Sequence, residues 1–312
     1  MSEIGIPRLG LAAILFGALA FAIVPLFVPT YQVSILTEVL IYAVLAMSVD
    51  ILAGYAGRTP LCLGAIFGVS TYVTVYWTST MAGSPYVGMM LGICAATLVA
   101  MVFALLAIRT TGVYFILLTL ALGMIIWGIC LRWTSVTGGE NGLRGNVRPV
   151  ELAAHLPFYY VVFAAVVVIT FAMWRFVRSP FGLTLRGIRD SDSRMRSLGY
   201  NVSLHMFIAF TVAGIFAGVA GALYAMFNDF VSPSTVALTQ SVEGLLMAIT
   251  GGAGTLFGSF IGALAIIGLE NAVSLYTERW QTVMGVAFIL IMIFAPEGIL
   301  GGIRTLLARK RG

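Results

Sequence analysis

The sequence predicts an all-α fold, a polytopic bundle of about ten transmembrane helices with both termini in the cytoplasm. The first observation is composition: 60% of the 312 residues are hydrophobic and only 9% are charged, whereas a soluble domain has about 25% charged residues. The second is that apolar residues fall in runs of about 18 to 21, the length of helix that crosses a hydrocarbon core of about 30 Å. The third is that arginine collects in alternate loops.

Ten apolar segments are predicted to cross the membrane. Their ranges are 9–29, 36–53, 61–80, 87–107, 112–131, 157–177, 206–227, 237–250, 257–276 and 280–296. The first also suggests a secretory signal peptide, but its apolar core of about 20 residues exceeds the roughly 7 to 15 usual for one. The eighth is short and contains Glu243, so it is either a crossing, whole or broken, or a re-entrant segment. We interpret it as a crossing, because its loss would place the Arg-Lys-Arg tail outside.

The positive charges determine the orientation. With a cytoplasmic N-terminus, thirteen of the 17 Arg and Lys residues lie in inside loops, and four lie outside. This distribution satisfies the positive-inside rule, and the reverse orientation violates it. We therefore expect a single transmembrane domain over residues 1–312, with a periplasmic loop at 132–156 and a cytoplasmic loop at 178–205.

The content of cysteine, histidine and lysine excludes several kinds of site. The three cysteines, all within apolar runs, are Cys62, Cys94 and Cys130. Their number and placement favour helix packing over a disulfide framework. His155 and His205 are too few and too far apart for a metal cluster. Lys310 is the only lysine, so the phosphate-binding loop G-x-x-x-x-G-K-[ST] is absent, and we predict neither catalytic residues nor a cofactor bound by this chain.

Residues 179–201, SPFGLTLRGIRDSDSRMRSLGYN, concentrate charge in a chain that has little. Pro180 at the start and Gly199 at the end predict a helix of about 18 residues between them, straight or bent. Its spacing places Arg186, Arg189 and Asp190 on one face. A solvated loop whose arginines only set topology is one interpretation. Because topology needs positive charge alone, the carboxylates favour a surface on which a partner docks.

The charged loop and five other stretches carry a resemblance to a known family. The loop is similar to the pattern S-P-x-G-R-x-x-x-A-I-R-E-N-E-x-A-A-x-x-L-G. The others are LAGYAGRTPLCLGAIFGVSTY (52–72), RTTGVYFILLTLALG (109–123), TSVTGGENGLRG (134–145), FVSPSTVALTQSVEGLLMAITGGAGTLFGSFIGA (230–263) and APEGILGG (295–302). Together they cover most of residues 40–302, and they resemble permeases of branched-chain amino acid ABC transporters, of the LivM type.

The resemblance implies a subunit of an ATP-binding cassette importer in the bacterial inner membrane. It implies four kinds of partner: a second, LivH-like permease, two cytoplasmic ATPase subunits that bind ATP and Mg, a periplasmic binding protein, and membrane lipid, with no role for nucleic acid. The charged loop would be the coupling helix that fits a groove on an ATPase. Its coupling residues would be Arg186, Arg189, Asp190, Asp192, Arg196 and Gly199. The solutes would be branched-chain amino acids, while related permeases carry urea, short amides or aromatic acids.

Two departures from the family pattern affect the partner and the solute. Arg194 and Met195 stand where the family usually has two small residues, so the docking face is expected to differ. In the loop after the second span, four residues replace the common Gln, Ser, Gly and His: Arg58, Pro60, Cys62 and Leu63. This turn either packs against the partner permease or meets the solute, which leaves the solute open.

Three carboxylates fall at membrane depth, where an ionisable group is a functional candidate. Asp50 either pairs with Arg58, lies at the interface, or faces the pathway. Glu243 either bonds to the backbone amides of a broken helix or lines the pathway, and Glu270 is interpreted as structural. The polar face of the third span is expected to turn from lipid towards a partner or the pathway; it comprises Ser70, Thr71, Tyr72, Thr74 and Tyr76. The predicted pathway residues are Asp50, Tyr72 and Glu243.

A proton-coupled secondary transporter is the alternative function. It would use Asp50, Glu243 and Glu270 as a proton relay. Secondary transporters need no coupling helix, and many are built from inverted repeats, of which no clear example is visible in the sequence. The favoured interpretation is therefore a transport permease without enzymatic activity, powered by ATP hydrolysis on partner subunits.

Overall fold

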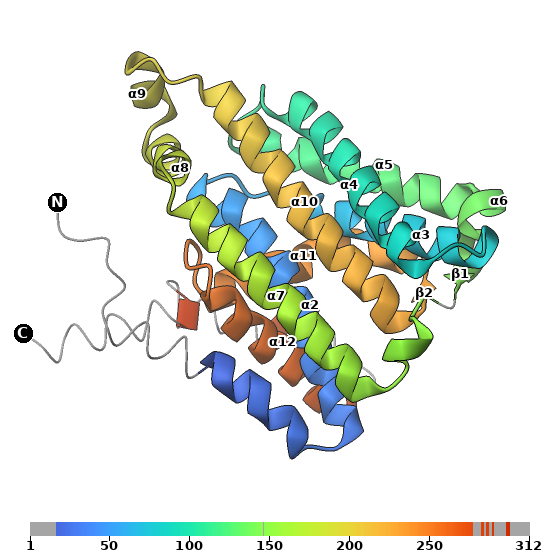
Figure 1. Cartoon of the computed structure of the whole chain (residues 1–312). Helices are drawn as coiled ribbons and strands as arrows, with labels where there is room; N and C mark the ends of the chain where they lie inside the picture. Colours follow the sequence, from blue (N-terminus) through green and yellow to red (C-terminus); the bar gives the residue numbers. More distant parts are fainter. Residues whose placement is uncertain are drawn as a thin grey trace, which may run out of the picture.

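The computed structural model describes residues 17–145, 147–276, 282–283, 285–286, 289 and 298–299 (Figure 1). The start of the first predicted span and nearly all of the tenth, 280–296, lie outside these residues. The helices over the intervening spans are α2 (Thr30–Asp50), α3 (Leu63–Thr80), α4 (Pro85–Ala107), α5 (Val113–Arg132), α7 (His155–Val177), α10 (Val202–Asn228), α11 (Leu238–Gly251) and α12 (Gly258–Ser274). Each predicted span from 36–53 to 257–276 therefore corresponds to one helix.

Five helices of the described chain are long and apolar enough to cross a membrane. They are Thr30–Tyr55, Pro85–Ala107, Val113–Arg132, His155–Val177 and Val202–Asn228. A further short apolar helix covers Gly17–Leu26 and includes the 3-10 turn η1 (Val24–Leu26). Helix α2 continues without interruption into a π-helical turn, η2 (Ile51–Tyr55). These features confirm an all-α protein with several apolar helices of membrane-spanning length.

The helices divide into a buried centre and an outer layer. From Val39 to Tyr55 nearly every side chain of α2 and η2 is buried, because this segment packs against α7, α10, α11 and α12. Helices α4, α5 and α7 instead expose one face of large apolar side chains, among them Met90, Leu98, Leu105, Leu117, Ile125, Val168 and Phe171. A continuous apolar outer face is expected where the surrounding solvent is lipid.

Helices α3, α4 and α10 pack together most closely. Small residues line these contacts: a Cβ atom on Gly221 would overlap the carbonyl oxygen of Phe67, and one on Gly218 would lie 2.7 Å from Cβ of Ala96. Glycine and alanine let helix backbones approach each other where lipid supplies no hydrophobic driving force. Gly214 and Gly218 of α10 both face α4 across this contact.

The polar segments gather at two opposite ends of the bundle (Figure 1). One end carries α8 (Pro180–Asp190) and α9 (Asp192–Ser197). The other carries α6 (Thr134–Thr137), the 3-10 turns η3 (Gly139–Asn141) and η4 (Val150–Leu152), and the strands β1 (Leu143–Arg144) and β2 (Phe230–Val231), whereas the turn η5 (Pro233–Val236) packs against α3 and α5. The two strands are antiparallel, with Leu143 opposite Val231 and Arg144 opposite Phe230. We refer to these as the α8–α9 end and the β1–β2 end.

Candidate functional site

The charged segment forms two helices and not the single helix predicted. The Ser179 hydroxyl caps α8 by accepting a hydrogen bond from an amide of its first turn at 3.4 Å. Ser191 has an extended backbone (φ −164°, ψ 105°) and caps α9 by accepting from the Arg194 amide at 3.3 Å. Serine competes with the helical backbone for hydrogen bonds and is favoured at N-caps, which explains the break. Gly199 ends the segment with φ +86°, as its position predicted.

Arg186 and Arg189 face their own chain. The Arg186 guanidinium lies over the Tyr55 ring, 5.0 Å from its centroid. Arg189 Nη1 donates a hydrogen bond to the carbonyl oxygen of Gly54 at 2.5 Å. Both contacts are made to η2, at the end of α2. Arg186, Arg189 and Asp190 are nevertheless all exposed, and Arg189 Nε lies 4.0 Å from Asp190 Oδ1. The two arginines therefore contact η2 and also contribute to the outward surface of α8.

Arg58 links the turn after η2 to α9. Its side chain is only 8% exposed, and Nη2 lies 3.4 Å from Asp192 Oδ2. Nη1 donates to the Thr110 carbonyl oxygen at 2.9 Å. Burial lowers the pKa of the Arg58 guanidinium, whereas the Asp192 carboxylate acts in the opposite direction and stabilises the charged form. Asp192 is also 3.6 Å from Arg196, one turn along α9. Pairing with Asp50, which was one of the interpretations of that carboxylate, is not the contact that Arg58 makes.

Asp50 bonds to the turn between α11 and α12. Its side chain is completely buried, and Oδ1 accepts a hydrogen bond from the Gly254 amide at 2.6 Å. Oδ2 has no hydrogen-bond partner among the residues that the structure describes. Bonding to the backbone at the end of a broken helix was one interpretation of Glu243, and the structure assigns that role to Asp50.

Glu243 is instead within electrostatic range of two other carboxylates, Glu38 of α2 and Glu270 of α12. All three side chains are partly exposed. Glu38 was missed as a candidate, although it falls inside the predicted span 36–53, where the rule that singled out the other carboxylates applies equally.

Tyr72 and the polar face of α3 lie inside the bundle. Thr71 Oγ1 donates to the Gly221 carbonyl of α10 at 2.9 Å, and Thr74 Oγ1 donates to the Gly88 carbonyl of α4 at 3.2 Å. The face predicted to meet a partner or the pathway is thus used for packing within the chain. Tyr72 is 6% exposed and lies near Cys130 of α5. The three predicted pathway residues are therefore in separate places and do not form one site.

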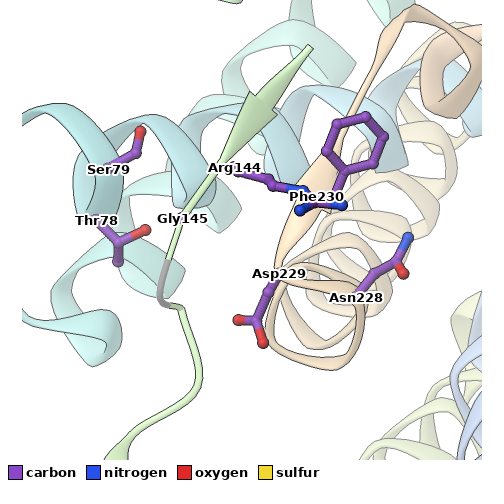
Figure 2. A pocket seen from close by; sticks show the side chains of 7 residues that line it. All are labelled: Thr78, Ser79, Arg144, Gly145, Asn228, Asp229 and Phe230. Carbon is purple, nitrogen blue, oxygen red and sulfur yellow. The ribbon is translucent and has the colours of Figure 1, made fainter. Parts of the chain in front are cut away.

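A pocket of about 620 Å³ opens at the β1–β2 end (Figure 2). It is lined by Thr78, Ser79, Arg144, Gly145, Asn228, Asp229 and Phe230. Asp229 Oδ1 holds the loop beside the pocket by accepting from the amides of Val147 at 2.9 Å and Arg148 at 3.1 Å. The Arg144 guanidinium lies 5.8 Å from the centroid of the Phe230 ring. The pocket thus has polar groups of both charges, at the opposite end from α8 and α9.

Comparison with known proteins finds similarity along most of the chain. The family described as "Branched-chain amino acid transport system / permease component" matches residues 31–295. The high-affinity branched-chain amino acid transport system permease protein LivM of Escherichia coli (strain K12) is 27% identical, over 98% of this chain and 77% of the relative. A probable branched-chain amino acid transport permease protein LivM of Methanocaldococcus jannaschii is 21% identical, over 83% and 90%.

A partial similarity extends to a differently named import system. The autoinducer 2 import system permease protein LsrC of Klebsiella pneumoniae is 27% identical, over 59% of this chain and 54% of the relative. No solved structure matches the chain significantly.

Proposed function

Because the chain belongs to the family of permease components of branched-chain amino acid transport systems, we propose that it forms, with a second permease, the membrane route of an amino acid importer of the ATP-binding cassette class. The observation that carries this proposal is the capped helix pair α8–α9, which contacts η2 at the end of α2 and Arg58 in the turn that follows it. A partner that moves this pair acts directly on the transmembrane helices. Two ATPase subunits would be that partner, and a separate binding protein would deliver the solute.

The docking face for an ATPase is the outward side of α8 and α9. Its exposed residues include Leu183, Arg186, Arg189, Asp190, Arg194, Arg196 and Leu198. Charges of both signs beside two exposed leucines suit a polar groove with an apolar floor, since rim charges orient a partner and apolar area contributes affinity. Arg186 and Arg189 also contact η2.

Aliphatic amino acids are the proposed solutes. Relatives that align with at least four fifths of this chain, among them one bacterial and one archaeal, are named for branched-chain amino acid transport. The relative named for autoinducer 2 covers a smaller share. Urea, short amides and aromatic acids are the alternative solutes.

Reconstitution tests the proposed function. The chain is placed in proteoliposomes with its second permease, the two ATPases and the binding protein, and uptake of labelled leucine is measured. Uptake is expected only with hydrolysable ATP. The neighbouring carboxylates Glu38, Glu243 and Glu270 are the one feature that favours a proton-coupled transporter. Leucine uptake driven by a proton gradient in the absence of ATPase subunits would support that alternative.

We also propose ten crossings with both termini in the cytoplasm, which places the α8–α9 end inside and the β1–β2 end outside. Single cysteines at Glu140 and Ser193, both exposed, test this topology. The background should carry Cys94→Ser, because Cys94 is exposed whereas Cys62 and Cys130 are buried. A membrane-impermeant maleimide is expected to label position 140 in intact cells and position 193 only after permeabilisation. Labelling of both positions from the same side would contradict the proposed topology.

Glu243, with Glu38 and Glu270, is proposed to face the pathway. Placing a partly exposed carboxylate against lipid at membrane depth costs free energy. Such groups therefore face water, a partner subunit or a solute. Three helices, α2, α11 and α12, each contribute one carboxylate to this face. A face of this charge can attract the ammonium group of an amino acid.

The Glu243→Gln variant is expected to assemble normally but to lower leucine uptake several-fold, because the substitution removes the charge at nearly constant volume. The measurement is initial uptake rate per assembled complex. Glu140→Gln, which changes an exposed loop residue in the same way, is the matched control. Equal rates in both variants would remove Glu243 from the pathway.

A further inference from the structure

Three segments that are far apart in sequence meet at the C-terminal end of α8. They are η2 at the end of α2, the last turn of α8, and the turn at 252–257 that joins α11 to α12. Arg189 Nη1 donates to Gly54 O in η2 at 2.5 Å, and Asp50, the residue before η2, accepts from Gly254 N in the turn at 2.6 Å. One polar chain of contacts therefore runs from α8 through η2 to the α11–α12 turn.

The three segments touch with almost no side chain between them. A Cβ atom on Gly54 would overlap both Asp50 Oδ1 and the Gly254 amide nitrogen. One on Gly57 would lie 2.5 Å from Cγ of Arg189, and one on Gly254 would lie 3.5 Å from Arg189 Nη1. Close-packed interiors transmit displacement because they have no free volume to absorb it. Because Arg189 also donates to Gly54, a shift of α8 towards η2 is expected to displace η2 or the turn.

Electrostatic attraction also connects Asp50 with Arg189. Asp50 is completely buried and makes one hydrogen bond within the described chain. A buried carboxylate is costly unless it is paired, and Arg189 is the cation whose charge acts on Asp50. The guanidinium thus binds a backbone carbonyl of η2 and also attracts the carboxylate that holds the α11–α12 turn.

We propose that Asp50 and Arg189 are positioning residues that connect the coupling helix α8 to the α11–α12 turn, so that displacement of α8 by its partner is passed to α11. This inference rests on the proposed function, because it takes α8 as the place where an ATPase acts. Helix α11 carries Glu243, so the connection ends at the carboxylates proposed to face the pathway. Arg186 and Asp192 hold α8 and α9 in place, but Arg189 makes the contact that reaches α11.

The physical connection is tested first on the isolated permease in nanodiscs, by amide hydrogen exchange. Arg189→Ala and Asp50→Asn are each expected to raise exchange in the 252–257 turn by about tenfold, as local opening becomes easier. Arg189→Lys, which keeps the charge and one donor, should recover part of the protection. Arg175→Ala is the matched control, since Arg175 is an exposed arginine near the end of α7 with no ion pair to the described residues. Exchange in the turn that is equal in Arg189→Ala and Arg175→Ala would overturn the connection.

The transport consequence is tested in the reconstituted importer by measuring leucine uptake and ATP hydrolysis together. Arg189→Ala and Asp50→Asn are expected to keep ATP hydrolysis but to lower the leucine moved per ATP by about tenfold, within the range of mutations that change coupling between sites. A merely structural role would lower both rates together through loss of folded complex. An unchanged ratio in both variants would refute the proposal. If wild-type uptake does not require ATP, the proposed function fails and the exchange result still stands on its own.

Discussion

Replacing Gly221 by alanine is expected to lower the free energy of unfolding by about 3 kcal/mol, the upper part of the range for overpacking a close-packed core. The added Cβ atom would overlap the Phe67 carbonyl oxygen, and no rotamer change can move a backbone atom. Separating α10 from α3 also weakens the hydrogen bond from Thr71 Oγ1 to the Gly221 carbonyl, worth about 1 kcal/mol.

The measurement for Gly221→Ala is the unfolding midpoint of the purified chain in mixed micelles titrated with denaturing detergent. Gly268→Ala is the control, because Gly268 of α12 has no atom within 4 Å of an added Cβ. Removing that glycine should leave stability unchanged or slightly higher, since alanine is favoured in helix interiors. A midpoint for Gly221→Ala as high as that of Gly268→Ala would mean that α3 and α10 can separate without cost.

Arg58→Ala is expected to release α9 from the bundle and to cost about 2 to 3 kcal/mol of local stability, the scale of hydrogen bonds made by a charged group. The substitution removes the bond to the Thr110 carbonyl and the ion pair with Asp192 together. Amide hydrogen exchange across 192–197 measures the effect as the free energy of local opening.

Arg196→Ala is the matched control for Arg58. Arg196 contacts the same Asp192 at 3.6 Å, but 57% of its side chain is exposed, so its loss should cost under about 0.5 kcal/mol. If both variants raise exchange equally, the buried position of Arg58 adds nothing to the ion pair. If neither does, α9 is held by its apolar contacts alone.

The helices could be predicted from sequence because their length is set by the membrane. Predicted spans such as 87–107 and 157–177 differ from α4 and α7 by two residues or fewer at each end, since an apolar run of this length has no other stable arrangement in lipid. The short eighth span, α11, was placed equally well. The helix after Ser179 was predicted to start where it does, because proline in the first turn and serine at the cap are local signals.

The contacts of the charged residues could not be predicted in the same way. Nothing near Arg58 in the sequence indicates that its partner is Asp192, because that pairing depends on how the turn after α2 meets α9 in three dimensions. A bend was allowed for between Pro180 and Gly199, but its position at Ser191 was not predicted, because only the two ends of the segment were used to predict the helix. Asp50 was recognised as a candidate because it lies at membrane depth. Its hydrogen bond to Gly254 could not be predicted, because the two residues are 204 positions apart in the sequence. Glu38 could have been found by the rule already applied to Glu243.

The direct backbone contacts among α3, α4 and α10 also restrict where the transporter can change shape. A Cβ on Gly92 would approach the Ser70 carbonyl oxygen at 2.6 Å, and Gly214 meets Ala100 just as closely. Helices that touch through backbone atoms cannot slide or rotate past one another without collision, whereas seams filled by long, flexible side chains can. We therefore expect these three helices to move as one rigid body during transport. Relative motion is expected instead at seams such as the one between α2 and α7, where Met47 lies against Thr170.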